Sequence, residues 1–96
     1  MKPGAKDNGL KVKYINRDNQ EVYADVPNVS EKIKLVLVKR KMSGQDLSPA
    51  LNFSKQAIYA RMQSNNWKLD QLAAISDLLD CDLEINFVMR DTQEKF

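Results

Sequence analysis

Residues 47–62, LSPALNFSKQAIYARM, constrain the fold of this chain more than any other stretch. Leu47 and Leu51 are four residues apart, which is the spacing of an apolar helix face. Ser54 is a good N-cap residue, and the next apolar pair, again four residues apart, lies behind it. Only Asn52-Phe53 separates the two helical patterns, which is enough for a tight turn and nothing longer. The sequence therefore predicts two short helices joined by a sharp turn.

Two consecutive helices of this kind form the helix-turn-helix geometry, in which the second helix enters the DNA major groove and the first crosses the backbone. The second helix suits this task because only Ile58 and Met62 need a core, so most of its surface is left over. Gln can bond adenine, Lys or Arg can bond guanine, and an alanine methyl can meet a thymine methyl. The amides at helix starts favour phosphate oxygens. The predicted DNA-binding residues are Ser43, Gln45, Ser54, Lys55, Gln56, Tyr59, Ala60, Arg61, Gln63 and Lys68.

Several side chains also have a structural alternative. Tyr59 is amphipathic and could pack onto the domain, and Arg61 could pair with a neighbouring carboxylate. Trp67 is expected to pack against the core. Cys81 is expected to be a small buried residue at a helix end.

The charges are strongly segregated along the chain. Residues 30–68 hold eight Lys and Arg against two Asp and Glu, whereas residues 69–96 hold two against seven. Such segregation gives one face a positive potential and makes the opposite end repel polyanions. The basic run Lys39-Arg40-Lys41 suits either a solvated helix end or a phosphate contact. Charge alone fits an anion-binding surface and a set of unrelated solvated faces equally well.

Strand-like segments flank the helices. Residues 10–16 and 20–26 interleave Val, Tyr and Ile with polar residues, and the Asn- and Asp-rich turn between them predicts a β-hairpin. Residues 83–90 alternate apolar and polar side chains and predict a third strand. We expect it to join the hairpin in a small antiparallel sheet, although strand edges of two protomers could pair instead. Residues 1–9 and 91–96 are expected to be a flexible and a frayed tail.

The remaining helices complete the predicted domain. Ser30 is the expected N-cap of a first helix, although the alternation in IKLVLV could also indicate a strand. Ser43 and Asp46 are expected to form a capping-box variant at the second helix, and a fourth helix is expected from about Leu69 to Leu79. The predicted fold class is α+β. It comprises a single domain over residues 10–90, with an N-terminal hairpin at 10–26, four to five helices over 30–80 and a C-terminal strand at 83–90.

From residue 30 to residue 88 the chain resembles the Cro/repressor (lambda-repressor-like, XRE-type) helix-turn-helix domains of phages, plasmids and bacterial regulators. The segments MSGQDLSPALNFSKQAIYARM and NNWKLDQLAAISDLLDCDLEINFV carry the resemblance. It implies a helical DNA-binding domain in which the helix after the turn reads the bases. The matching positions are Met42, Leu47, Leu51, Phe53, Ser54, Lys55, Gln56, Ala57, Ile58, Met62, Trp67, Leu69, Leu72, Ile75 and Leu79.

Three residues depart from the pattern. Gly44 stands where such proteins commonly carry a Gln that contacts phosphate. Pro49 lies inside the second helix, which should therefore kink or restart with Ser48 as its cap. Lys68 occupies the usual cap position of the fourth helix, where a cation opposes the helix dipole, so Asn65 or Asn66 could cap instead.

The resemblance and the open helix face together predict a sequence-specific, double-stranded DNA-binding transcriptional regulator. We expect a repressor of phage, plasmid or mobile-element type that binds a palindromic operator as a homodimer. The alternative is a helix-turn-helix-derived protein-interaction module, such as an antirepressor, an antitoxin or an inhibitor of a host enzyme. The acidic last third of the chain would offer the interface for such a protein partner.

Other functional classes are disfavoured. The chain has no histidine, which removes the usual general base and the commonest metal ligand. It also lacks a glycine-rich phosphate loop and a nucleophile–base pair, so we expect no enzymatic activity, no metal and no cofactor. A single cysteine and the absence of an apolar run of membrane-spanning length predict a cytoplasmic protein that does not bind membranes.

Overall fold

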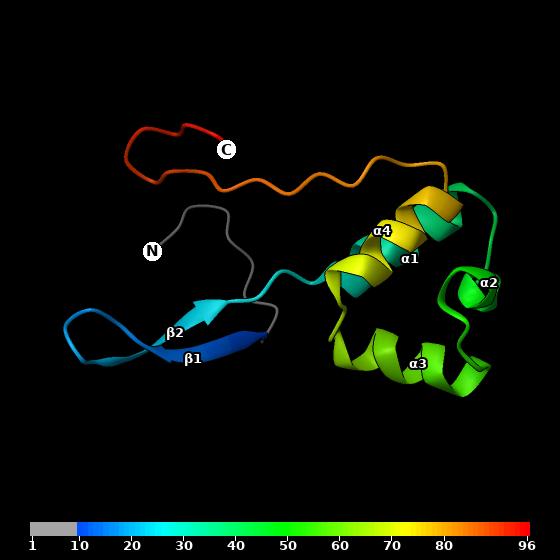
Figure 1. Cartoon of the computed structure of the whole chain (residues 1–96), viewed down its shortest axis with the longest axis horizontal. Helices are drawn as coiled ribbons and strands as arrows, with labels where there is room; N and C mark the ends of the chain where they lie inside the picture. Colours follow the sequence, from blue (N-terminus) through cyan, green and yellow to red (C-terminus); the bar gives the residue numbers. More distant parts are fainter. Residues whose placement is uncertain (1–9) are drawn as a thin grey trace.

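The structure is a computed structural model that describes residues 10–96, so the tail expected over residues 1–9 lies outside the described part. The molecule is elongated, with extents of 45 × 27 × 23 Å. The helices gather at one end, while the β-hairpin and the segment after the last helix extend toward the other (Figure 1). None of the described helices has the length and apolar character needed to cross a membrane.

Helix α1 (Val29–Lys39) shows that IKLVLV is helical. Its N-cap is Asn28, whose Oδ1 accepts a hydrogen bond from the Glu31 N–H over 3.1 Å. The expectation that Ser30 caps this helix was wrong. Ser30 lies within the first turn and is buried. Its hydroxyl accepts a hydrogen bond from the Trp67 indole.

The helix before the turn is split in two by Pro49. A 3-10 turn, η1 (Gly44–Leu47), leads into the one-turn helix α2 (Ser48–Leu51), as the predicted restart requires. Pro49 is tolerated because it lies in the first turn of α2, where its missing N–H has no partner to lose. The helix ends at Asn52, which adopts the left-handed conformation with φ 55°.

The expected capping box of Ser43 and Asp46 is present at the start of η1. The Asp46 carboxylate accepts from the Ser43 N–H over 2.7 Å, which is one half of a capping box. The Asp46 N–H also donates to the Ser43 carbonyl oxygen over 3.0 Å. The expectation that Ser48 caps α2 was wrong, since its hydroxyl donates to the Phe53 carbonyl oxygen over 2.8 Å and thereby holds the turn.

Helices α3 (Lys55–Ser64) and α4 (Leu69–Leu78) follow with a short loop between them. Asn65 ends α3 with φ 58°. Neither Asn65 nor its neighbour caps α4. Instead, Gln71 reaches back from the first turn, and its Oε1 accepts from the Lys68 N–H over 2.9 Å.

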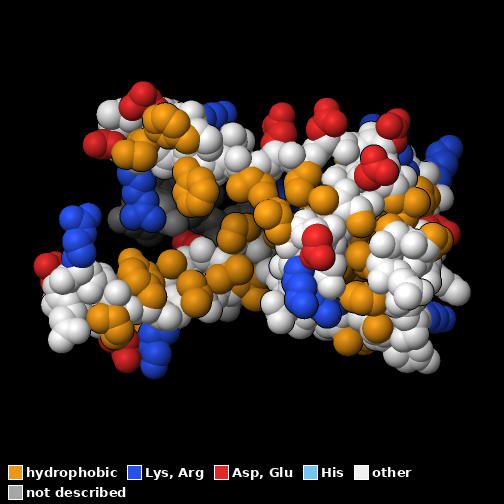
Figure 2. All heavy atoms as spheres, viewed as in Figure 1, with side chains coloured by type: hydrophobic (Ala, Val, Ile, Leu, Met, Phe, Trp, Pro, Cys, Tyr) orange, Lys and Arg blue, Asp and Glu red, His pale blue; other side chains and the backbone are white. Residues whose placement is uncertain are grey.

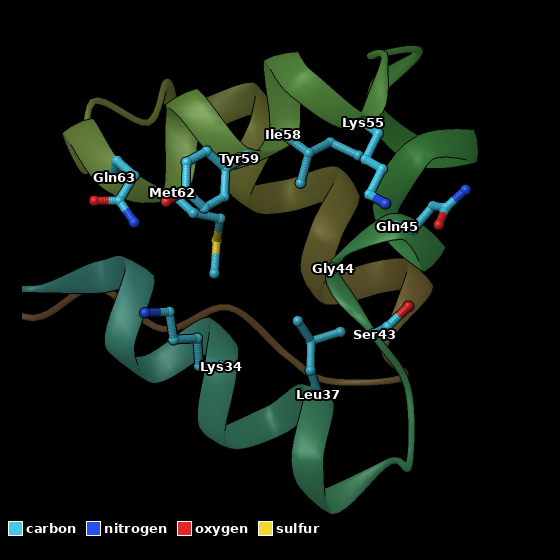
Figure 3. A pocket seen from close by; sticks show the side chains of 10 residues that line it. All are labelled: Lys34, Leu37, Ser43, Gly44, Gln45, Lys55, Ile58, Tyr59, Met62 and Gln63. Carbon is cyan, nitrogen blue, oxygen red and sulfur yellow. The ribbon is translucent and has the colours of Figure 1, made fainter.

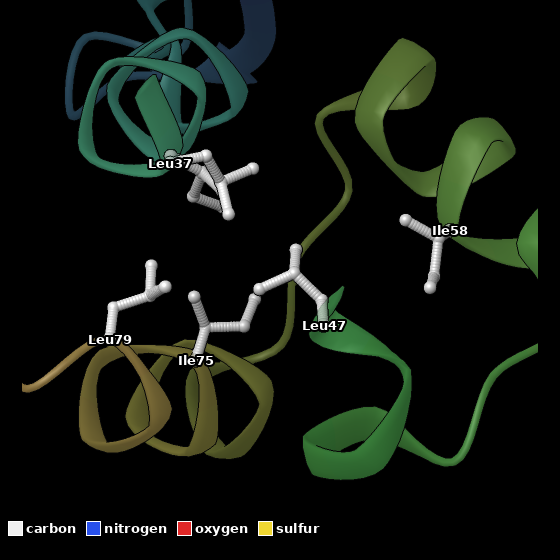
Figure 4. Close-up of a cluster of buried hydrophobic side chains, with 6 residues drawn as sticks. Leu37, Leu47, Ile58, Ile75 and Leu79 are labelled. Carbon is white, nitrogen blue, oxygen red and sulfur yellow. The ribbon is translucent and has the colours of Figure 1, made fainter. Parts of the chain in front are cut away.

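The core lies between α1, the turn region and α4 (Figure 4). Leu47 at the end of η1 is fully buried and packs between side chains of α1, α3 and α4. Trp67 packs against this cluster, as predicted, and Cys81 also packs against it but is partly rather than fully buried. The buried apolar residues are Ile33, Leu37, Leu47, Ile58, Ile75 and Leu79.

The predicted hairpin is present as β1 (Lys11–Ile15) and β2 (Glu21–Asp25), paired antiparallel with Lys13 opposite Tyr23. Asn16 shapes the turn, because its Oδ1 accepts from the N–H groups of Asp18 and Gln20. Val12 and Tyr14 share one face and are half exposed. The hairpin therefore forms without burying an apolar face in the core.

The C-terminal strand does not join this sheet, which has two strands only. Residues 83–86 make no backbone hydrogen bond within the described chain, whereas residues 87–89 pair back onto residues 94–96. The final residues are therefore hydrogen-bonded rather than frayed. The α+β architecture holds in the described residues with four α-helices and one 3-10 turn, without the predicted three-stranded sheet or a fifth α-helix.

Candidate nucleic-acid interface

Helix α3 presents an open face made of the predicted base-reading residues. The hydroxyl of Ser54 accepts from the Ala57 N–H over 3.1 Å and fixes the start of the helix. Ile58 is buried and Met62 is half-buried, so the helix is anchored along one side only. The opposite side is exposed and carries Lys55, Gln56, Tyr59, Ala60 and Gln63. Tyr59 does not pack onto the domain, since 67% of its surface is exposed.

Arg61 lies differently from the other predicted residues of α3. One of its terminal guanidinium nitrogens donates to the Asn66 carbonyl oxygen over 2.7 Å and to Gln71 Oε1 over 3.1 Å. The guanidinium carbon also lies 5.4 Å from the centre of the Phe53 ring, in a cation–π contact. These contacts tie α3 to the turn before it and to the start of α4. The guanidinium is thus engaged within the domain and is not grouped with the open face.

The start of the helix-turn-helix unit carries Ser43 and Gln45, both exposed. The Asp46 carboxylate accepts from both the N–H and the hydroxyl of Ser43. Ser43 is therefore already paired, and a negative charge stands beside it, which weakens it as a phosphate ligand. Gln45 has no such partner among the described residues and stays available.

Gly44 leaves room for a side chain. A Cβ built on this residue would lie 3.8 Å from Cγ2 of Ile58, an ordinary van der Waals distance. The missing Gln of the family pattern is therefore not excluded by packing. The backbone conformation at this position does not require glycine, since Gly44 does not adopt a positive φ.

A cleft of ≈ 470 Å³ separates α1 from α3, next to the open face (Figure 3). Leu37, Ile58 and Met62 supply its apolar surface. Lys34 from α1 lies across the cleft from Tyr59 and Gln63 of α3. Lys34 is a candidate that the sequence did not single out. Its position three residues before Leu37 places it at the border of the apolar face of the helix, and this spacing was the signal that could have found it.

Lys68 is exposed at the start of α4, after the loop that follows α3. Within the basic run at the end of α1, Arg40 has a structural role. Arg40 donates from Nε to the Leu79 carbonyl oxygen over 2.9 Å and from a terminal nitrogen to the Asp80 carbonyl oxygen over 3.1 Å. It therefore caps the C-terminus of α4. In Figure 1 this end of α1 lies away from α3.

The electrostatic setting favours a polyanion on the α3 side. Residues 47–69 contain Lys55, Arg61 and Lys68 and no acidic residue. The acidic side chains that follow α4 gather instead along the extended segment at the upper edge of the molecule (Figure 2). A duplex approaching α3 therefore meets a positive surface, while the far edge repels it.

Comparison with protein families matches residues 32–84, more than half of the chain, to the Cro/C1-type HTH DNA-binding domain. The matched region begins within α1 and runs through α4 to the first residues after it. Neither the comparison with curated proteins nor that with solved structures finds a significant match. The arrangement of α2, the turn and α3 agrees with this assignment. The chain belongs to the Cro/C1-type helix-turn-helix DNA-binding family and is a DNA-binding transcription regulator.

Proposed function

We propose that this protein is a sequence-specific repressor that inserts α3 into the major groove of an operator. The observation that carries the proposal is the open face of α3, on which Lys55, Gln56 and Tyr59 are all exposed. Gln56 lies in the first turn, the part of such a helix that contacts base edges, and its amide matches the edge of adenine. Ala60 is exposed on the same face, and its methyl group suits contact with a thymine methyl.

Phosphate contacts would supply most of the affinity and fix the register on the duplex. Gln45 and Lys34 line the cleft beside the open face, and Lys68 is exposed at the start of α4, so all three are suited to this role. The first amides of α3 add a further site for a phosphate oxygen. Repression follows when the operator overlaps a promoter, as expected of the regulators that phages and plasmids encode.

We further propose a homodimer that reads a palindromic operator. Dimers of this fold class bind half-sites about 34 Å apart, so that each α3 enters successive turns of the same groove. A two-fold dimer requires a two-fold operator. Selection of binding sites from random duplex DNA tests both statements, because a palindromic consensus with the expected spacing supports them and a single unrepeated site contradicts the dimer.

A polarisation titration with random duplex at low salt tests DNA binding itself. Micromolar or tighter binding that weakens steeply with added salt is expected. Absence of binding at micromolar protein would contradict the proposal and favour the alternative, a module that binds another protein. The acidic character of residues 69–96, which hold seven Asp and Glu against two Lys and Arg, is the observation on which that alternative rests.

A further inference from the structure

The segment after α4 is extended, and its first part lacks a strand partner. Within the described chain, residues 82–86 take part in no backbone hydrogen bond. Apolar side chains of this segment are also exposed, with 56% of the surface of Ile85 and 77% of that of Phe87 accessible. An exposed strand with unpaired N–H and C=O groups and an apolar row is a template for pairing with another strand.

One edge of this strand is occupied and the other is open. Phe87 exchanges both of its backbone hydrogen bonds with Phe96, and the Met89 N–H donates to the Glu94 carbonyl oxygen. Because backbone groups of successive residues in a strand point to opposite edges, those of Asn86 and Val88 face away from the 94–96 strand. The open edge therefore continues along the outer side of the terminal hairpin, in which residues 87–89 pair with residues 94–96.

We propose that residues 82–90 pair antiparallel with the same segment of a second copy, in the register that sets Asn86 opposite itself. This inference rests on the proposed homodimer and names its interface. In this register Leu83 lies opposite the partner's Met89 and Ile85 lies opposite the partner's Phe87. All four apolar side chains of the row then meet apolar side chains on one face of the new sheet.

The charges agree with the same register. Asp82 lies opposite the partner's Arg90, the first residue of the terminal turn, at both ends of the paired segment, so two pairs of opposite charge flank the apolar row. The hydrogen-bonded pairs are Asn86 with its copy and Glu84 with the partner's Val88, which use the open edge only. The two terminal hairpins together make a four-stranded sheet, which is more stable than an isolated hairpin.

Neighbouring registers are less favourable. Setting Phe87 opposite itself would leave Leu83 facing the partner's Asp91. A shift by one residue would place apolar side chains against the polar face throughout. The self-complementarity of the segment therefore selects the two-fold axis at Asn86, and an interface that matches its own copy is what a two-fold dimer needs.

Site-directed crosslinking tests the register. In a Cys81→Ala background, Asn86→Cys is expected to form a disulfide-linked dimer under mild oxidation, because Cα atoms of such a pair are about 5.5 Å apart and within disulfide range. Glu84→Cys is the matched control, since the two copies would lie about 13 Å apart along the strand. Crosslinking through Phe87→Cys in preference to Asn86→Cys, or through neither, would overturn the proposed register.

Charge reversal tests the interface without oxidation. Sedimentation equilibrium should show a dimer for the natural chain. Asp82→Arg and Arg90→Asp should each raise the dimer dissociation constant roughly tenfold, because each sets like charges opposite one another twice. The double variant should recover most of the lost association. The inference would be overturned if the double variant associated as weakly as the single variants or more weakly. A natural chain that is monomeric at tens of micromolar would also overturn it.

DNA binding separates this inference from the proposed function. If the chain is monomeric but still binds DNA with a preference that depends on Gln56, the proposed interface is wrong and the proposed regulator function is retained. If the chain dimerises through residues 82–90 but binds no duplex, the interface is supported and the proposed DNA-binding function is contradicted.

Discussion

The indole Nε1 of Trp67 donates a hydrogen bond to the hydroxyl of buried Ser30 over 2.9 Å. The same first turn of α1 is held from another side, where the Ser30 N–H donates to Asn65 Oδ1 over 2.9 Å and Asn65 Nδ2 donates to the Pro27 carbonyl oxygen over 2.9 Å. Asn65 ends α3. These three hydrogen bonds therefore fix α3, which carries the open face, relative to α1.

Replacing Ser30 by Ala should lower the free energy of unfolding by about 1–3 kcal/mol, because the Trp67 N–H would lose its acceptor in a partly buried site. Urea denaturation followed by circular dichroism measures this effect. Ser76→Ala is the matched control, since the Ser76 hydroxyl bonds only the Ala73 carbonyl oxygen within its own helix. An equally small change in both variants would contradict the role assigned to this contact.

Leu47→Ala should destabilise the protein by about 2–5 kcal/mol, because it opens a cavity at a side chain with no exposed surface. Leu69→Ala, at a helix position that is 62% exposed, makes the same chemical change outside the core and should stay within about 0.5 kcal/mol. Chemical denaturation of both variants checks the difference. A mild effect of Leu47→Ala would mean that η1 is not a core element.

Gln56→Ala and Arg61→Ala should have opposite profiles. Gln56→Ala should cost about 1–3 kcal/mol of discrimination at one base position and leave unfolding almost unchanged. Arg61→Ala should keep the base preference but reduce stability by about 1 kcal/mol, since it removes contacts with Asn66, Gln71 and the Phe53 ring. Binding-site selection and denaturation on both variants separate the roles, and a changed consensus for Arg61→Ala would return that residue to the interface.

Gly44→Gln should strengthen DNA binding by about 0.5–1.5 kcal/mol, because it adds a donor for a phosphate oxygen at a position with room for it. Gly44→Ala is the control, as it adds the Cβ without the amide and should leave affinity unchanged. Polarisation titrations on one duplex compare the variants. Weaker binding by Gly44→Gln with unchanged stability would mean that this residue does not face the backbone of the duplex.

Removing a phosphate-contacting lysine should flatten the salt dependence of binding. Lys55→Ala and Lys34→Ala should each reduce the slope of log affinity against log salt by about 1, since one fewer counterion is released on binding. Lys39→Ala, at the end of α1 that lies away from α3 in Figure 1, should leave the slope almost unchanged. A reduced slope for Lys39→Ala would instead implicate the end of α1 in backbone contact.

Local signals in the sequence were sufficient for the helix-turn-helix unit. The apolar spacing of Leu47, Leu51 and Ile58, the Ser54 cap and the two-residue turn are each determined by neighbours within a few positions, so the helices and the open face of α3 could be predicted. The restart at Pro49 could be predicted for the same reason, because proline acts on its own turn of backbone. The N-terminal hairpin likewise depends on a local turn.

Only the tertiary structure decided which partners the polar side chains take and where the last strand goes. Ser30, Arg61 and Arg40 bond groups that are distant in sequence or across a turn, and no periodicity indicates such partners. Residues 83–90 have a clear alternation, yet alternation specifies a face and not a partner strand. Strand pairing depends on which backbone edge lies close to the segment. In this fold the hairpin edge does not pair with residues 83–90.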